Sequence, residues 1–272
     1  MAVWTVVNVE RYLPGHPGPS PQPHLSHGLD VAGGSWREYG NRAGFWRLRE
    51  MLGELDIPVT AAVNSVICRE YPRIAEAIRD SGWEVMAHGR DNSTGHHGLA
   101  AAEESALVTE VVETLGTAFG RAPAGWLTPG FSVSERTHEL VAAAGARYVA
   151  DFGHDDRPSW LATPAGPLLA VPYGLETNDI TLFLSARHTG PEFAAAITDH
   201  VEQLAREHGG GTVVALGLHT FLVGQPGRIG HLRRCLDRLR AIDGVWLATG
   251  ERIAAEYAKE YPHDRDPGAA RP

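Results

Sequence analysis

Short apolar runs rich in β-branched residues alternate along this chain with longer segments of helical period, and this alternation restricts the fold most strongly. Strand-then-helix units predict a parallel sheet with helices packed against it. The runs predict strands over residues 2–9, 58–63, 83–87, 124–128, 147–150, 168–172, 212–218 and 244–247. The helical spacing predicts helices over residues 40–55, 70–81, 101–118, 134–144, 190–207, 228–241 and 249–259.

The length of 272 residues suits one large barrel built from such units. We therefore predict an α/β fold, a distorted (β/α) barrel of about seven parallel strands, as a single domain over residues 1–260. Residues 14–35 are rich in Pro and Gly, and they are predicted to form an irregular loop over the barrel mouth. Residues 261–272 are predicted to be a frayed tail.

Composition narrows the partners that the protein can have. The formal net charge of -9 disfavours binding to nucleic acid or to an anionic membrane surface. The first ten residues contain neither a basic leader nor a membrane-spanning apolar stretch. Cys68 and Cys235 form no disulfide framework. Together these features predict a cytoplasmic protein.

Parallel barrels carry their chemistry at the carboxyl ends of the strands. The predicted strand ends bring together four candidate catalytic residues, namely Glu10, His88, Asp151 and His219. Two further histidines, His96 and His97, are instead expected to be exposed in a loop. For His88 and His219, the alternative is a structural histidine with hydrogen-bonded ring nitrogens.

These residue types suit hydrolysis by an activated water molecule. Glu10 would take a proton from water, and His219 would give a proton to the leaving nitrogen. The chain has no serine in a Gly-x-Ser-x-Gly turn and no cysteine at a predicted strand end. A covalent nucleophile is therefore disfavoured.

Several motifs occur in an order that is known from one family. They are "REYGNRAGFWRL" (37–48), "EVMAHGRDN" (84–92), "GWLTPG" (125–130), "VPYGLETNDI" (171–180) and "LGLHTFLVGQPGR" (216–228). In these motifs the chain resembles the polysaccharide deacetylase superfamily (NodB-homology type), and it is most similar to the allantoinase-like and uncharacterised deacetylase-like branch. The resemblance covers roughly residues 1–258. It implies a distorted seven-stranded β/α barrel that hydrolyses a non-peptide C–N bond.

This chain has only some of the residues that the resemblance implies as metal ligands. Metal-dependent members have two acids after the first strand and a His-x-x-x-His pair, where this chain has Glu10 with Asn8, and His88 with Asn92. Asparagine is a weak ligand for a transition metal. The sequence therefore favours a site without a cofactor, in which His88 and backbone N–H groups polarise the carbonyl. The alternative is a divalent metal such as zinc on Glu10, His88 and Asn92, with the base supplied by Asp151 or its neighbours.

The predicted substrate is a small soluble amide, imide or ureide. The residues predicted to contact it are Asn92, Trp126, Pro129, Tyr173, Glu176 and Asp179. One alternative is a metal-dependent N-deacetylase for polysaccharides or amino sugars, and another is a non-catalytic barrel that binds a ligand. Similarity to the family also implies a homo-oligomer.

Overall fold

The structure is a computed structural model that describes residues 1–20, 30–207 and 210–263. Within these ranges nine strands form one curled sheet. The strands are β1 (Ala2–Val9), β2 (Val59–Val63), β3 (Glu84–Ala87), β4 (Gly125–Trp126), β5 (Tyr148–Val149), β6 (Ser159–Thr163), β7 (Gly166–Ala170), β8 (Val213–His219) and β9 (Trp246–Leu247).

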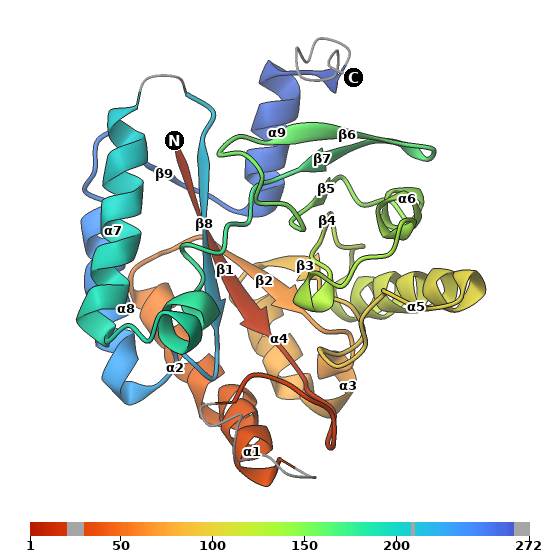
Figure 1. Cartoon of the computed structure of the whole chain (residues 1–272), viewed down its shortest axis with the longest axis horizontal. Coiled ribbons are helices and arrows are strands. Elements are labelled where there is room, and N and C mark those ends of the chain that lie inside the picture. Colours follow the sequence, from red (N-terminus) through yellow and green to blue (C-terminus); the bar gives the residue numbers. More distant parts are fainter. Residues whose placement is uncertain (21–29, 208–209, 264–272) are drawn as a thin grey trace.

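The strands follow one another across the sheet in the order β6-β7-β5-β4-β3-β2-β1-β8, and β9 pairs with the start of β1. Neighbouring strands run parallel except β6 and β7, which form an antiparallel pair at one edge. A parallel bridge between Asn178 and Gly217 brings the segment after β7 against β8. The sheet therefore curls toward closure (Figure 1), and the predicted distorted (β/α) barrel is confirmed.

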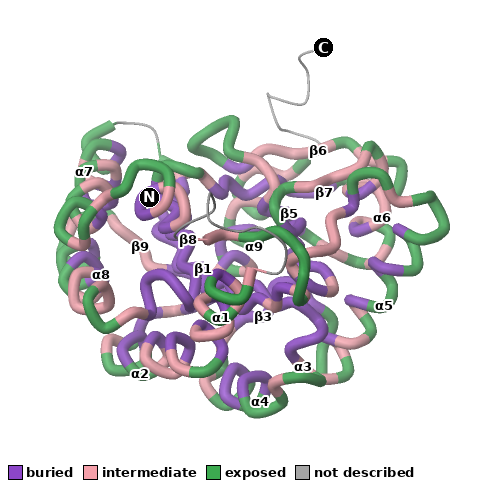
Figure 2. The backbone as a smooth tube through the Cα atoms, turned by 60° about the horizontal axis from the view of Figure 1, so that its bottom comes forward, coloured by how far each residue is buried: buried purple, intermediate pink, exposed green. Residues whose placement is uncertain are grey.

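Helices surround the sheet, with exposed residues on their outer turns and buried residues toward the strands (Figure 2). The α-helices are α1 (Val31–Tyr39), α2 (Phe45–Glu54), α3 (Ile67–Glu70), α4 (Pro72–Asp80), α5 (Ala101–Phe119), α6 (Thr137–Ala143), α7 (Gly190–Arg206), α8 (Pro226–Leu239) and α9 (Gly250–Glu260). Short helical turns of other types are η2 (Gly40–Gly44), η3 (Pro129–Phe131) and η4 (Thr181–Ser185). None of the helices in the described ranges combines the length and apolar character needed to cross a bilayer.

The alternation of side chains along β1 positions the first polar residues of the barrel interior. Trp4 and Val6 belong to the apolar cluster inside the barrel, whereas Val7 packs in the cluster between sheet and helices. Successive side chains of a strand point to opposite faces. Continuing this alternation places Asn8 and Glu10 on the inner face at the carboxyl end of β1.

One predicted helix start needs correction, and one strand was missing from the prediction. The helical region before β2 starts at Val31, so residues 31–35 belong to α1 and not to the predicted irregular loop. The reason is local, because the Asp30 side chain caps the helix by accepting a hydrogen bond from the Gly33 N–H at 2.8 Å. Strand β6 was not predicted, since this edge strand is only partly buried and lacks a continuous apolar run. Residues 14–20 of the predicted loop form no helix or strand, whereas residues 21–29 of that loop and 264–272 of the predicted tail lie outside the described residues.

Trp4 packs inside the barrel, where it is fully buried and donates a hydrogen bond from Nε1 to Thr60 Oγ1 at 2.7 Å. We predict that Trp4→Ala lowers the free energy of unfolding by about 3–5 kcal/mol, measured by urea denaturation, because it opens a cavity and removes the hydrogen bond. Val31→Ala is the control, because Val31 is 67% exposed and its truncation should change stability by less than about 0.5 kcal/mol. A loss for Trp4→Ala as small as that of the control would contradict the prediction.

Candidate active site

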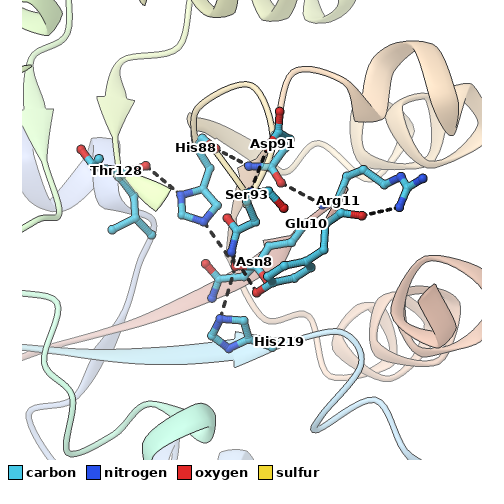
Figure 3. A network of polar contacts seen from close by, with 12 residues as sticks. Asn8, Glu10, Arg11, His88, Asp91, Ser93, Thr128 and His219 are labelled. Atoms are coloured by element: carbon cyan, nitrogen blue, oxygen red, sulfur yellow. Dashed lines mark hydrogen bonds and ion pairs between the residues drawn. The ribbon is translucent and has the colours of Figure 1, made fainter. Parts of the chain in front are cut away.

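Three of the predicted catalytic residues meet at the carboxyl end of the barrel. Glu10 follows β1, His88 follows β3, and His219 is the last residue of β8. Glu10 Oε1 lies 3.3 Å from His88 Nε2 and 3.5 Å from His219 Nε2 (Figure 3). All three residues are buried, yet all three line one cavity of about 320 Å³. Segments far apart in the sequence thus form one polar centre.

The ring orientation of both histidines is fixed from behind. His88 Nδ1 lies 2.7 Å from the Leu127 carbonyl oxygen, which can only accept, so Nδ1 carries the proton. His219 Nδ1 lies 2.6 Å from Asp179 Oδ1, and the other carboxylate oxygen of Asp179 accepts a 2.7 Å hydrogen bond from the His219 N–H. Each imidazole therefore presents Nε2 to the same oxygen of Glu10.

The opposite charges of Glu10 and His219 stabilise each other. Burial by itself raises the pKa of Glu10, but the neighbouring His219 and His88 outweigh burial and hold that pKa well below its usual range. Burial likewise lowers the pKa of His219, but Glu10 and Asp179 prevail and raise it to about 10. Near neutral pH the site therefore holds a carboxylate base beside an imidazolium acid.

Tyr12 and Asn92 fix the carboxylate of Glu10 in place. The Tyr12 hydroxyl donates to Glu10 Oε2 at 2.8 Å. The Asn92 amide Nδ2 donates to Glu10 Oε1 and to the Tyr12 hydroxyl, at 2.9 Å in both cases. Burial and Glu10 raise the pKa of Tyr12 well above its ordinary value, so Tyr12 stays a neutral donor. Asn41 adds a 2.8 Å hydrogen bond from Nδ2 to the Glu10 carbonyl oxygen.

On the floor of the cavity the side chains of Tyr173 and Asn178 pack closely against the backbone of Gly217. A Cβ atom at this position would lie 2.6 Å from both Tyr173 Oη and Asn178 Nδ2, so no larger residue fits. The Tyr173 hydroxyl accepts a 3.0 Å hydrogen bond from Asn8 Nδ2. Two amide side chains and one phenol thereby meet beside Glu10 on the floor.

The donor set does not fit a bound zinc ion. Among the described residues no group of three or more His, Cys, Asp or Glu side chains is arranged to hold a metal. Asn92, at the place of the second histidine of the His-x-x-x-His pair, turns its amide N–H toward Glu10 and acts as a hydrogen-bond donor. A catalytic zinc site usually takes three protein ligands, so the predicted alternative set of Glu10, His88 and Asn92 is not supported.

Asp151 lies apart from the cavity, contrary to its predicted catalytic position. Its carboxylate accepts hydrogen bonds from the Thr128 N–H at 2.7 Å and from Thr128 Oγ1 at 2.9 Å. His138 Nε2 approaches the same carboxylate at 3.0 Å. Strand β5 is short, and the chain beyond it turns the side chain toward the neighbouring strand end, so Asp151 supports the loop that begins at Thr128.

The predicted substrate contacts divide into two groups. Asn92 and Tyr173 line the cavity, and their contact with a substrate stays a prediction. Four others do not line it. Trp126 is packed in the core between sheet and helices, and Pro129 lies against Gly89. Glu176 is exposed outside the cavity, and Asp179 lies behind His219.

Sequence reasoning missed several lining residues and misplaced one histidine. Tyr12, Phe131 and Leu175 all line the cavity. For Tyr12 the alternation Asn8-Glu10-Tyr12 was an available signal, whereas Phe131 and Leu175 sit in loops that give none. His96, expected in an exposed loop, is fully buried, with Nδ1 3.0 Å from Glu104 Oε1.

With this geometry established, the relationship to known proteins can be stated. Residues 38–149 match a family model described as polysaccharide deacetylase. The matched stretch includes His88 and Asn92 but neither Glu10 nor His219, so these last two join the site through the fold.

Individual proteins are similar to this chain over most of its length. A Schizosaccharomyces pombe protein named as a polysaccharide deacetylase is 27% identical over 246 residues, which cover 83% of this chain and 76% of that protein. The crystal structure of Puue allantoinase superimposes with a TM-score of 0.88 at 26% identity, covering 96% of this chain and 91% of that one. A Pseudomonas aeruginosa PAO1 structure classed with the polysaccharide deacetylases gives 0.84 at 26% identity, covering 96% and 92%.

These matches confirm the family resemblance inferred from the motifs. They also indicate a hydrolase that acts on carbon–nitrogen bonds other than peptide bonds, which is the predicted enzyme class.

The charge on His219 gives a prediction for pH dependence. The raised pKa means that the stability from charged His219 is fully present below about pH 6.5 and is lost as pH rises through about 10. We predict that nuclear magnetic resonance of labelled histidine shows His219 doubly protonated at pH 8. Glu10→Gln and Asp179→Asn should each lower its pKa, because each removes a negative partner. Titration of His219 near 6.5 in the unaltered protein would contradict the assignment.

Proposed function

We propose that this protein hydrolyses a C–N bond in a small soluble amide, imide or ureide by metal-independent general acid–base catalysis. The observation that carries the proposal is the placement of Glu10 Oε1 against the Nε2 atoms of both His88 and His219 in one cavity. Near neutral pH Glu10 is negatively charged and His219 is positively charged, so Glu10 can accept a proton and His219 can donate one.

In the proposed mechanism Glu10 acts as the base. Its Oε1 removes a proton from a water molecule in the cavity, and the water oxygen attacks the carbonyl carbon of the substrate. Asn8 and Asn178 each direct one amide N–H at the Tyr173 hydroxyl, and the second N–H of each amide can hold a carbonyl oxygen of the substrate. Tyr12 and Asn92 keep the carboxylate from rotating.

His219 then acts as the acid. Its Nε2–H gives a proton to the nitrogen of the tetrahedral intermediate, and the C–N bond breaks to release an amine and an acid. Asp179 holds Nδ1–H and stabilises the imidazolium before this step. The proton taken by Glu10 can return to His219 across the 3.5 Å that separates them, which resets the site.

His88 has a more limited part than the sequence suggested. Because its Nδ1–H is committed to the Leu127 carbonyl, Nε2 can donate to a substrate only when the ring is doubly protonated. With that second proton Nε2 can donate to Glu10 Oε1 or to the substrate carbonyl, whereas a ring protonated at Nδ1 alone offers only an acceptor at Nε2.

A second candidate is an N-deacetylase for amino-sugar polymers. It is supported by the naming of the Schizosaccharomyces pombe and Pseudomonas aeruginosa relatives. A small-molecule substrate, cytoplasmic location and self-association stay predictions of the sequence.

The mechanism predicts which side chains turnover requires. Purified protein should release product from at least one of allantoin, cyclic imides, formamides or N-acetylated amino sugars. With that substrate, Glu10→Gln and His219→Gln should each lower kcat by roughly 10²- to 10⁴-fold, as expected for loss of a general base or acid. Glu176→Gln and His97→Gln are matched controls, because both residues are exposed and lie outside the cavity. Unchanged turnover in His219→Gln would exclude this residue as the acid and would favour a non-catalytic barrel.

Metal dependence separates the two candidate functions. Dialysis of active protein against a chelator should leave kcat unchanged, because the residues that hold Glu10 are hydrogen-bond donors and not metal ligands. Metal content measured on the same samples provides the check. Stoichiometric zinc, with activity lost on chelation and regained on adding zinc, would overturn the metal-independent mechanism.

A further inference from the structure

The rim of the active-site cavity exposes large apolar side chains. Within the described ranges three large hydrophobic residues are exposed: Val31 at 67%, Phe131 at 37% and Leu175 at 51%. Phe131 and Leu175 both line the cavity, and Val31 does not. Single exposed apolar residues are common, but two at the mouth of one pocket indicate a surface that is covered when a ligand binds.

The backbone at Phe131 supports the same conclusion. Its φ of 55° lies in the left-handed region that a bulky residue rarely adopts, and it directly follows Gly130 at 58°. Hydrogen bonds impose this turn: the Phe131 N–H donates to the Thr128 carbonyl at 3.0 Å, and the next carbonyl, of Ser132, accepts from the His96 and His97 N–H groups at 2.8 and 2.9 Å. Backbone strain of this kind is concentrated at functional sites.

The chemistry of the cavity changes from floor to rim. The floor carries the amides, the phenol and the charged centre already described, whereas Pro17, Pro19 and Ile180 join Phe131 and Leu175 among the lining residues. No lysine or arginine is found among the described lining residues, and the charged His219 is already paired with Glu10 and Asp179. A carboxylate or phosphate on the substrate would therefore find no unpaired lysine or arginine among these residues. A polar amide fits the floor, and an uncharged apolar group fits the rim.

We propose that the substrate carries an uncharged, flat apolar group, such as an aryl ring, which packs against Phe131 and Leu175 while its amide lies beside Glu10 and His219. The amide end of this assignment rests on the proposed function. The apolar end rests on the rim alone, and it makes Phe131 and Leu175 residues that determine specificity.

Binding to a hydrolysis-blocked protein tests the apolar end directly. In a Glu10→Gln background, calorimetry should show that N-benzylformamide binds on the order of tenfold tighter than N-methylformamide, and tighter than N-acetylglucosamine. Adding Phe131→Gly or Leu175→Ala should bring the ratio between the two formamides close to one. Adding Val31→Ala should leave the ratio unchanged, since this exposed side chain lies outside the cavity.

Phe131→Gly also separates recognition from folding. Glycine adopts a positive φ without strain, so the melting temperature should stay the same or rise while the preference for the aryl group is lost. A Phe131→Gly protein that keeps the preference overturns the proposal, as does equal binding of both formamides or tighter binding of N-acetylglucosamine to the Glu10→Gln protein.

The same ligands distinguish this inference from the proposed function. If the unaltered protein binds the aryl amide selectively but hydrolyses none of the panel, the proposed function fails and the apolar subsite stands. If it hydrolyses small amides with no preference for an aryl group, the proposed function stands and the apolar subsite fails.

Discussion

The burial of one carboxylate, that of Glu10, governs the organisation of the whole site. An unpaired carboxylate in a protein interior costs several kcal/mol, so its surroundings must compensate. Here His219 supplies opposite charge, and Tyr12 and Asn92 supply hydrogen bonds. His219 is in turn held charged by a second buried carboxylate, Asp179. The electrostatic compensation that makes Glu10 tolerable in the core is the same arrangement that equips the pair for acid–base chemistry.

The departure from the metal-dependent pattern follows from this compensation. In a metal site a cation would neutralise the buried acid, and a histidine would occupy the position of Asn92. In this chain the amide of Asn92 donates to Glu10, and the imidazolium of His219 provides the positive charge. In the metal-independent mechanism that we propose, the fold shared with Puue allantoinase and with the deacetylase relatives accommodates a centre whose charge is balanced by side chains alone.

Positions on regular strands were the predictable part of the fold and the site. Glu10, His88 and His219 follow continuous apolar runs, and parallel strands carry such ends to one edge of the barrel whatever the loops do. The same reasoning predicts a catalytic Asp151, which instead bonds Thr128. Trp126 and Asp179 are predicted substrate contacts on residue type and motif alone, and they lie in the core and behind His219. Strands β4 and β5 span two residues each, so alternation along them is too brief to fix which way the next side chain points.

The sequence by itself determined the barrel, the family resemblance and the three residues at its centre, because strand periodicity and the order of motifs along the chain do not depend on loop conformation. Only the tertiary structure decided what surrounds that centre. The turn that forces Phe131 to the rim, the hydrogen bonds that tie Asp151 to Thr128, and the contact of Tyr12 with Glu10 depend on backbone direction and on partners distant in sequence. Such contacts arise from packing in three dimensions, which no pattern along the chain specifies.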